Sequence, residues 1–118
     1  QTVDIFNPKT IRATMGSIFR VPFVYVPDLA PVLEQMHAKG IYTYAAHLKG
    51  QEYYDSFSFR EPTAFLIGNE GNGLSKEISD QAGQYLKIPM EGRVESLNAS
   101  IAAALLMYEA HRQRSARL

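Results

Sequence analysis

The sequence has 118 residues, enough for one domain with a sizeable hydrophobic core. It contains no cysteine, which excludes disulfides, a thiol nucleophile and zinc sites that need cysteine ligands. Twelve Lys and Arg residues balance twelve Asp and Glu residues, so any contact with nucleic acid must come from local clusters of charge. No apolar run approaches the roughly 20 residues that span a bilayer, and the first residues lack the build of a signal peptide. We therefore expect a cytoplasmic protein that makes no membrane contact.

Two groups of basic residues stand out in this neutral sequence. They are Lys9, Arg12 and Arg20 near the start, and Arg112, Arg114 and Arg117 near the end. The second group has two interpretations, contact with an anionic partner or the usual preference for cations at a helix C-terminus. Charge alone leaves both open.

The first half of the chain predicts two helices and two strands. Residues 7–19 begin with Asn-Pro, a good helix start, and carry apolar residues at helical spacing. Residues 21–26 are β-branched and aromatic without polar alternation, as is typical of a strand buried on both faces. A helix over residues 28–39 is then expected to end at Gly40, followed by a strand over residues 41–46.

The second half continues the alternation after a long loop. Residues 47–62 lose periodicity, and we expect an ordered loop with at most a short helical turn, whose aromatics pack inside the protein or, alternatively, stack on a nucleobase. Strands are predicted over residues 63–67 and 85–88, with a helix starting at Ser75 and a last helix over residues 96–114. Alternating strands and helices of this size predict an α/β fold, a parallel sheet with helices on both faces.

Two loops that follow strands carry polar residues among glycines, and we expect both to border one ligand crevice, because strand ends splay there. Residues 68–74 match neither a Walker loop nor a dinucleotide fingerprint, and a tight turn would explain their glycines equally well. Glu70 contributes no packing in such a loop and could pair with a cation, a sulfonium or an amide. In the second loop, Ser96 and Asn98 either cap the last helix or bind the ligand. The three histidines have no metal-ligand spacing, so no metal is expected.

At these loops the sequence resembles the SpoU (TrmH-like) family of RNA ribose 2′-O-methyltransferases, which belongs to the knotted SPOUT superfamily. The matching stretches are residues 66–75, LIGNEGNGLS, and residues 88–90, IPM, followed by residues 94–100, VESLNAS. Residues 7–20 also look like the family's segment before its central strand. The resemblance covers essentially the whole chain.

The resemblance implies a single catalytic domain over residues 1–118 whose C-terminal segment forms a deep trefoil knot, an exception to the rule against knots. It implies S-adenosyl-L-methionine as cofactor, bent among the knot loops. Six positions would contact the cofactor or wall its adenine: Ile67, Gly68, Ile88, Pro89, Met90 and Leu97. Three polar positions would surround the reacting centre as catalytic residues: Glu70, Ser96 and Asn98.

The implied activity is methyl transfer to a ribose 2′-hydroxyl of rRNA or tRNA, by a homodimer in which the last helix packs against its twin. The alternative is a SPOUT-like domain that binds RNA or cofactor without catalysis. The family also carries an earlier motif with an asparagine and a catalytic arginine, and nothing in this sequence matches it. We therefore expect an N-terminally incomplete domain, lacking the first strand and helix, that is weak or inactive by itself.

Overall fold

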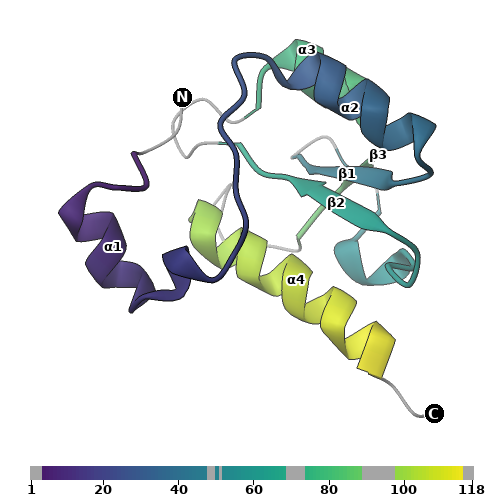
Figure 1. The fold of residues 1–118 in the computed structure, drawn as a ribbon. Coiled ribbons are helices and arrows are strands. Elements are labelled where there is room, and N and C mark those ends of the chain that lie inside the picture. Colours follow the sequence, from purple (N-terminus) through teal and green to yellow (C-terminus); the bar gives the residue numbers. More distant parts are fainter. Residues whose placement is uncertain (1–3, 48–49, 51, 69–73, 89–97, 116–118) are drawn as a thin grey trace.

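The computed structural model describes residues 4–47, 50, 52–68, 74–88 and 98–115. The elements in chain order are α1 Pro8–Thr14, η1 Ser17–Phe19, α2 Leu29–Ala38, β1 Tyr42–Ala46, η2 Tyr54–Ser56, β2 Thr63–Leu66, α3 Lys76–Gln81, β3 Gln84–Leu86 and α4 Ala99–Ser115, where η denotes a 3₁₀ turn. Figure 1 shows the strands as a central layer, with α2 and α3 on one side and α4 on the other. None of the helices in these ranges combines the length and apolar content needed to cross a bilayer.

The strands form a three-stranded sheet in the order β2-β1-β3, and β1 pairs in parallel with both neighbours. Leu66 lies opposite Ala45 on one side of β1, and Leu86 lies opposite Ala46 on the other. Parallel neighbours need crossover connections that place helices on the faces of the sheet. The predicted α/β class, a parallel sheet covered on both faces, is confirmed.

The alternation of side chains along β1 builds two cores. Tyr44 points toward α4 and joins a cluster with Phe59, Leu86, Leu106 and Ala110. The next residue, Ala45, points the other way and is fully buried in a second cluster. That cluster includes Leu33 and Met36 of α2, Leu66 of β2 and Ile78 of α3. Because successive strand residues face opposite sides, one central strand anchors both helical layers.

Local sequence signals fix the ends of several helices as expected. The Asp28 carboxylate accepts a hydrogen bond from the Ala30 N–H at 3.1 Å and caps α2, while Gly40 adopts a φ of 79° just after that helix. Ser75 caps α3 through the Ile78 N–H at 3.3 Å. These caps satisfy N–H groups that have no partner within the helix.

Two predicted elements differ from the structure. The helix predicted over residues 7–19 breaks after Thr14, because Met15 and Gly16 adopt positive φ values of 52° and 88°, and a short 3₁₀ turn follows. Residues 21–26 form no strand, although their composition predicted one. A strand needs a neighbour that completes its backbone hydrogen bonds, and the described sheet pairs none with this segment.

The long loop folds as predicted, as far as it is described. It contains the short turn η2, and its aromatics Phe57 and Phe59 lie within 5.4 and 5.0 Å of the Tyr44 ring, measured between ring centroids. Phe59 is fully buried. The packing interpretation of these two aromatic residues is therefore confirmed.

The C-terminal end of α4 holds this loop in place through side-chain hydrogen bonds. Gln113 accepts from the Phe59 N–H at 2.6 Å and donates to the Phe57 carbonyl at 2.9 Å. Arg114 donates to the carbonyls of Phe59 and Glu61, both at 2.9 Å. Because these backbone groups lie outside any sheet, α4 supplies the partners they need.

An ion pair between the buried Glu109 carboxylate and the largely exposed Arg112 side chain completes this end of α4. Arg112 donates two hydrogen bonds to the Glu109 carboxylate, each at 2.8 Å, and Gln113 donates a third at 2.9 Å. These bonds lower the pKa of Glu109 from 4.5 to about 2, the hydrogen bond from Arg112 being the largest cause.

We predict that Glu109→Gln lowers the free energy of unfolding at neutral pH by about 1.5 kcal/mol, since hydrogen bonds to a charged group are lost. A lowered pKa stabilises the folded state above the unfolded-state value, so this advantage should disappear as pH falls from 4.5 to about 2. Urea denaturation of both proteins across this range measures it. A difference between the two proteins that is independent of pH would contradict the assignment.

Candidate functional site

The candidate site lies at the carboxyl edge of the sheet, where three strands end together. Because β2 and β3 both run parallel to β1, residues 67–68 and 87–88 leave the sheet at the same edge. One strand separates them, which corresponds to a spacing of about 10 Å between the two chain segments. The structure thus brings together the strand exits that the sequence placed beside one crevice.

Two of the predicted cofactor residues share one face of this edge. Ile67 and Ile88 are both partly buried and pack against the α4-side cluster that contains Tyr44 and Leu106. Gly68 directly follows Ile67 and leaves the backbone free of a side chain at the strand exit. The edge therefore offers aliphatic surface next to bare backbone.

Asn98 directly precedes α4 and caps it. Its side-chain oxygen accepts hydrogen bonds from the Ser100 N–H at 2.8 Å and the Ile101 N–H at 3.4 Å. The capping interpretation of Asn98 is confirmed by these bonds. Figure 1 shows that α4 begins on the side of the molecule toward which the strand arrows point.

The remaining predicted site residues lie outside the described residues. They are Glu70, Pro89, Met90, Ser96 and Leu97. Their predicted roles stay predictions, as does the knot, which would involve the segments that contain them.

His47 is a residue at this edge that the sequence did not single out. It follows the last residue of β1, and its ring stacks on Tyr85 with the ring centroids 4.9 Å apart. The Tyr85 hydroxyl donates to Asp80 at 2.8 Å, a hydrogen bond that raises the pKa of Tyr85. In the sequence, the one signal that could have marked His47 is its position directly after a buried strand.

An open hollow of about 590 Å³ lies at the opposite edge of the sheet, near the amino ends of the strands. The Thr43 hydroxyl accepts from the Gly83 N–H at 2.8 Å and lies 2.8 Å from Nε2 of His37. Thr43 thus contacts both His37 and Gly83, and none of the predicted site residues lines this hollow.

Metal binding finds no support in the described ranges. There, no group of three or more histidine, aspartate or glutamate side chains is placed to hold a metal ion.

Comparison with known proteins identifies the family to which this chain belongs. The chain is similar to YacO of Bacillus subtilis, a protein assigned to the TrmH family of tRNA/rRNA methyltransferases, at 38% identity over 104 residues. This match covers 88% of the chain and 42% of YacO, so the chain spans about two fifths of that relative.

Two solved structures share the fold over nearly the whole chain. AviRb of Streptomyces viridochromogenes, a SpoU methyltransferase solved in complex with S-adenosylmethionine (AdoMet), has a TM-score of 0.88 and 37% identity, covering 98% of this chain and 46% of AviRb. An RNA 2′-O ribose methyltransferase has a TM-score of 0.85 and 32% identity, covering 97% of this chain and 44% of its own. The model of the SpoU rRNA methylase family matches residues 1–108. The chain therefore belongs to the SpoU rRNA methylase family, as its resemblance in sequence indicated.

Proposed function

We propose that this chain acts in an S-adenosylmethionine-dependent RNA methyltransferase that methylates a ribose 2′-hydroxyl of rRNA or tRNA. The observation that carries the proposal is the shared strand exit of Gly68 and Ile88, in a chain that aligns over 98% of its length with a relative solved with S-adenosylmethionine. An open parallel sheet binds ligands at this edge.

The described residues fit such a cofactor. Ile67 and Ile88 offer aliphatic surface for an adenine ring, and Gly68 allows close approach of backbone to the ligand. In the proposed site, Pro89 and Met90 complete the adenine wall and Leu97 adds backbone contacts. The bound cofactor supplies a methyl group activated by a positively charged sulfur.

Methyl transfer requires that the 2′-hydroxyl be oriented and lose its proton. The ribose oxygen would gain the methyl group as the carbon–sulfur bond of the donor breaks and leaves a neutral thioether, while the hydroxyl proton would pass to a base. Positioning and general-base assistance would therefore contribute much of the rate. We assign this work to Glu70, Ser96 and Asn98. Asn98 would hold the ribose or a phosphate, and Glu70 would orient the amide and balance nearby positive charge. The need for a 2′-hydroxyl selects RNA over DNA.

The same proposal includes a trefoil knot and a homodimer. The proposed knot would form where the C-terminal segment threads through a loop of the same chain. In the dimer, α4 presents an exposed apolar face made of Ile101, Leu105 and Tyr108, with exposed fractions of 53%, 38% and 74%. The spacing of these three residues places them on one side of a helix. Ala102 and Ala110 are buried within this chain. The exposed side chains of Ile101, Leu105 and Tyr108 would therefore contact the twin helix.

We predict that the full-length protein transfers label from methyl-labelled S-adenosylmethionine to RNA, and that digestion yields 2′-O-methylnucleosides. Label found only in methylated bases would contradict the ribose assignment. Cofactor binding measured by calorimetry, without any transfer to cellular rRNA or tRNA, would favour the non-catalytic SPOUT-like alternative.

Substitution at Asn98 should separate capping from catalysis. Asn98→Ala removes the cap and is expected to cost about 1 kcal/mol of stability, whereas Asn98→Asp keeps an oxygen that can accept the same hydrogen bonds. We predict that both variants lose methyl transfer by about 100-fold or more, because neither retains the amide. Thermal unfolding and methyl transfer measured on both variants test this. Transfer at the normal rate by Asn98→Asp would leave Asn98 with the capping role alone.

The proposed dimer can be tested by placing a charge on the exposed face of α4. We predict that Leu105→Glu shifts the protein from dimer to monomer in sedimentation equilibrium, because burying an unpaired carboxylate is unfavourable. Leu29→Glu, which alters a similarly exposed leucine on α2, is the matched control and should leave the dimer intact. A wild-type protein that sediments as a monomer would refute the dimer.

A further inference from the structure

We propose that Lys9, Arg12 and Arg20, here called the basic arm, contact the phosphates of the RNA substrate. This inference rests on the proposed function and assigns a place on the chain to the substrate rather than to the cofactor. Cationic side chains on a protein surface bind nucleic acid largely through its phosphates and position it for the reaction.

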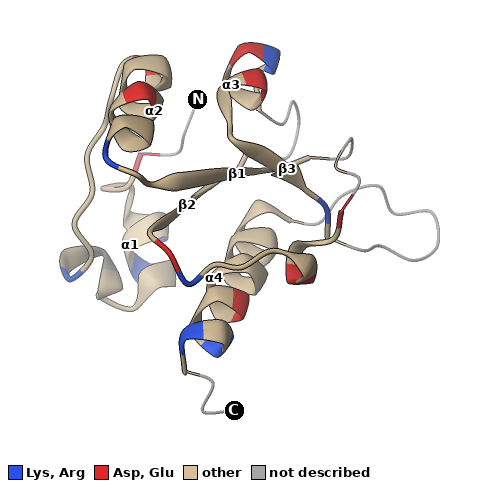
Figure 2. Cartoon of the chain, turned by 90° about the vertical axis from the view of Figure 1, so that its right-hand side faces the viewer, with Lys and Arg blue, Asp and Glu red and all other residues tan. Residues whose placement is uncertain are grey.

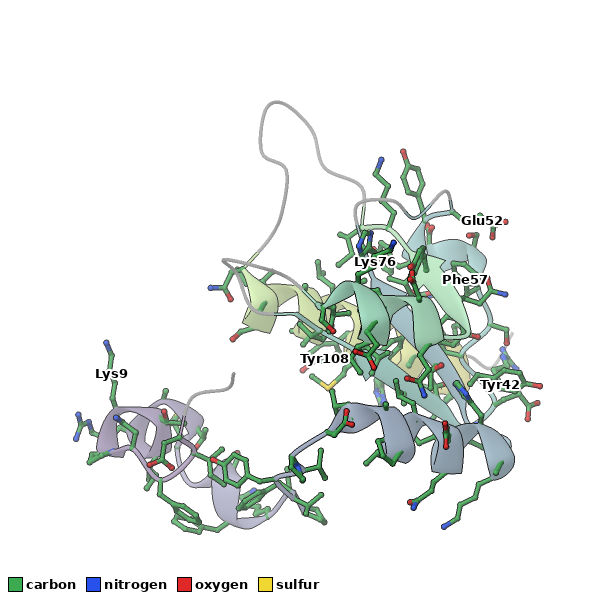
Figure 3. The ribbon with its side chains drawn as sticks, turned by 90° about the horizontal axis from the view of Figure 1, so that it is seen from above. Lys9, Tyr42, Glu52, Phe57, Lys76 and Tyr108 are labelled. Carbon is green, nitrogen blue, oxygen red and sulfur yellow. The ribbon has the colours of Figure 1, made fainter. Side chains whose placement is uncertain are left out.

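The basic arm is a concentration of uncompensated positive charge. Residues 7–27 contain three cations and no aspartate or glutamate. Lys9 and Arg12 lie three residues apart on α1, which places them on one side of the helix, and Arg20 directly follows η1. All three are exposed, and Figure 3 shows the Lys9 side chain extending away from the ribbon.

No carboxylate in the described residues neutralises the arm. Within the described residues, the ion pair is Arg112–Glu109, which lies at the other end of the chain. In Figure 2 the basic residues of α1 stand apart from the acidic residues on α2, α3 and α4. The chain has no net charge, so this separation concentrates positive potential on one segment.

The described members of the second basic group, Arg112 and Arg114, bind within the protein. Arg112 is bound by Glu109, and Arg114 donates to the carbonyls of Phe59 and Glu61. Each of these two guanidinium groups already donates two hydrogen bonds within the protein. Of the two groups seen in the sequence, the arm is the one whose described cations remain available to an anionic partner.

The position of the arm suits a substrate of the candidate site. Figure 1 shows α1 on the side of the molecule toward which the strand arrows point, the same side on which α4 begins. An RNA strand bound along α1 would therefore pass next to the carboxyl edge of the sheet. The arm would hold the phosphate backbone while the residues of that edge act on a ribose.

The test measures how RNA binding depends on salt. A fluorescein-labelled single-stranded RNA of about 20 nucleotides is titrated with the full-length protein by fluorescence anisotropy, over roughly 50 to 200 mM salt. The test variant is Lys9→Gln/Arg12→Gln. The matched control is Lys39→Gln/Arg60→Gln, which removes one lysine and one arginine near the amino ends of β1 and β2. Both variants carry the same net charge.

Removing one cation that binds a phosphate should reduce the slope of log K against log salt by about 0.7 for a single strand. We expect the slope of the test variant to fall by about 1.4, a further Arg20→Gln to lower it by about 0.7 more, and the control to keep the wild-type slope. Equal slopes for the test variant and the control would overturn the proposal, and so would a wild-type protein that binds no RNA.

Calorimetry with S-adenosylmethionine, run in parallel, keeps the two proposals distinct. A variant of the arm that has weaker RNA affinity but still binds the cofactor supports the arm without bearing on the cofactor site. A wild-type protein that binds RNA with the expected salt dependence but does not bind S-adenosylmethionine would refute the proposed function and leave the arm as an RNA-binding segment.

Discussion

The parallel pairing of β1 with strands on both sides is the constraint on which the rest of the structure depends. A strand in this position is covered on both faces, so Tyr44 and Ala45 must each find a helical layer. The same pairing makes all three strands end at one edge. Packing and the candidate site thus have a common origin, because the geometry that buries β1 also brings Gly68 and Ile88 to the same edge of the sheet.

Helix α4 joins the core to the site and leaves one face for a partner. Its buried side carries Leu106 and Ala110 into the core, and its last turns hold the preceding loop through Gln113. Its first residue follows Asn98, whose side chain caps the helix. One rigid element therefore sets the position of a proposed catalytic residue and of a proposed dimer face.

Much of the fold could be read from local signals, and the exceptions have physical causes. Asp28, Ser75 and Gly40 marked helix ends correctly because capping needs only neighbouring backbone. The strand predicted over residues 21–26 was wrong, because β-branched and aromatic residues favour a strand but supply no neighbouring strand to pair with it. Within the site, the sequence indicated both strand exits and Asn98, yet passed over His47, whose stacking on Tyr85 requires a contact far along the chain.

The sequence by itself determined the class of fold, the family and the motifs of the candidate site, since these follow from local periodicity, turn residues and short motifs. Only the tertiary structure decided how the charges are used. Both basic groups look alike in the sequence, but a cation's role depends on which carboxylates and carbonyls surround it. Those neighbours come from distant parts of the chain, as Phe59 does for Arg114, so only the folded arrangement separates a structural arginine from one available to a substrate.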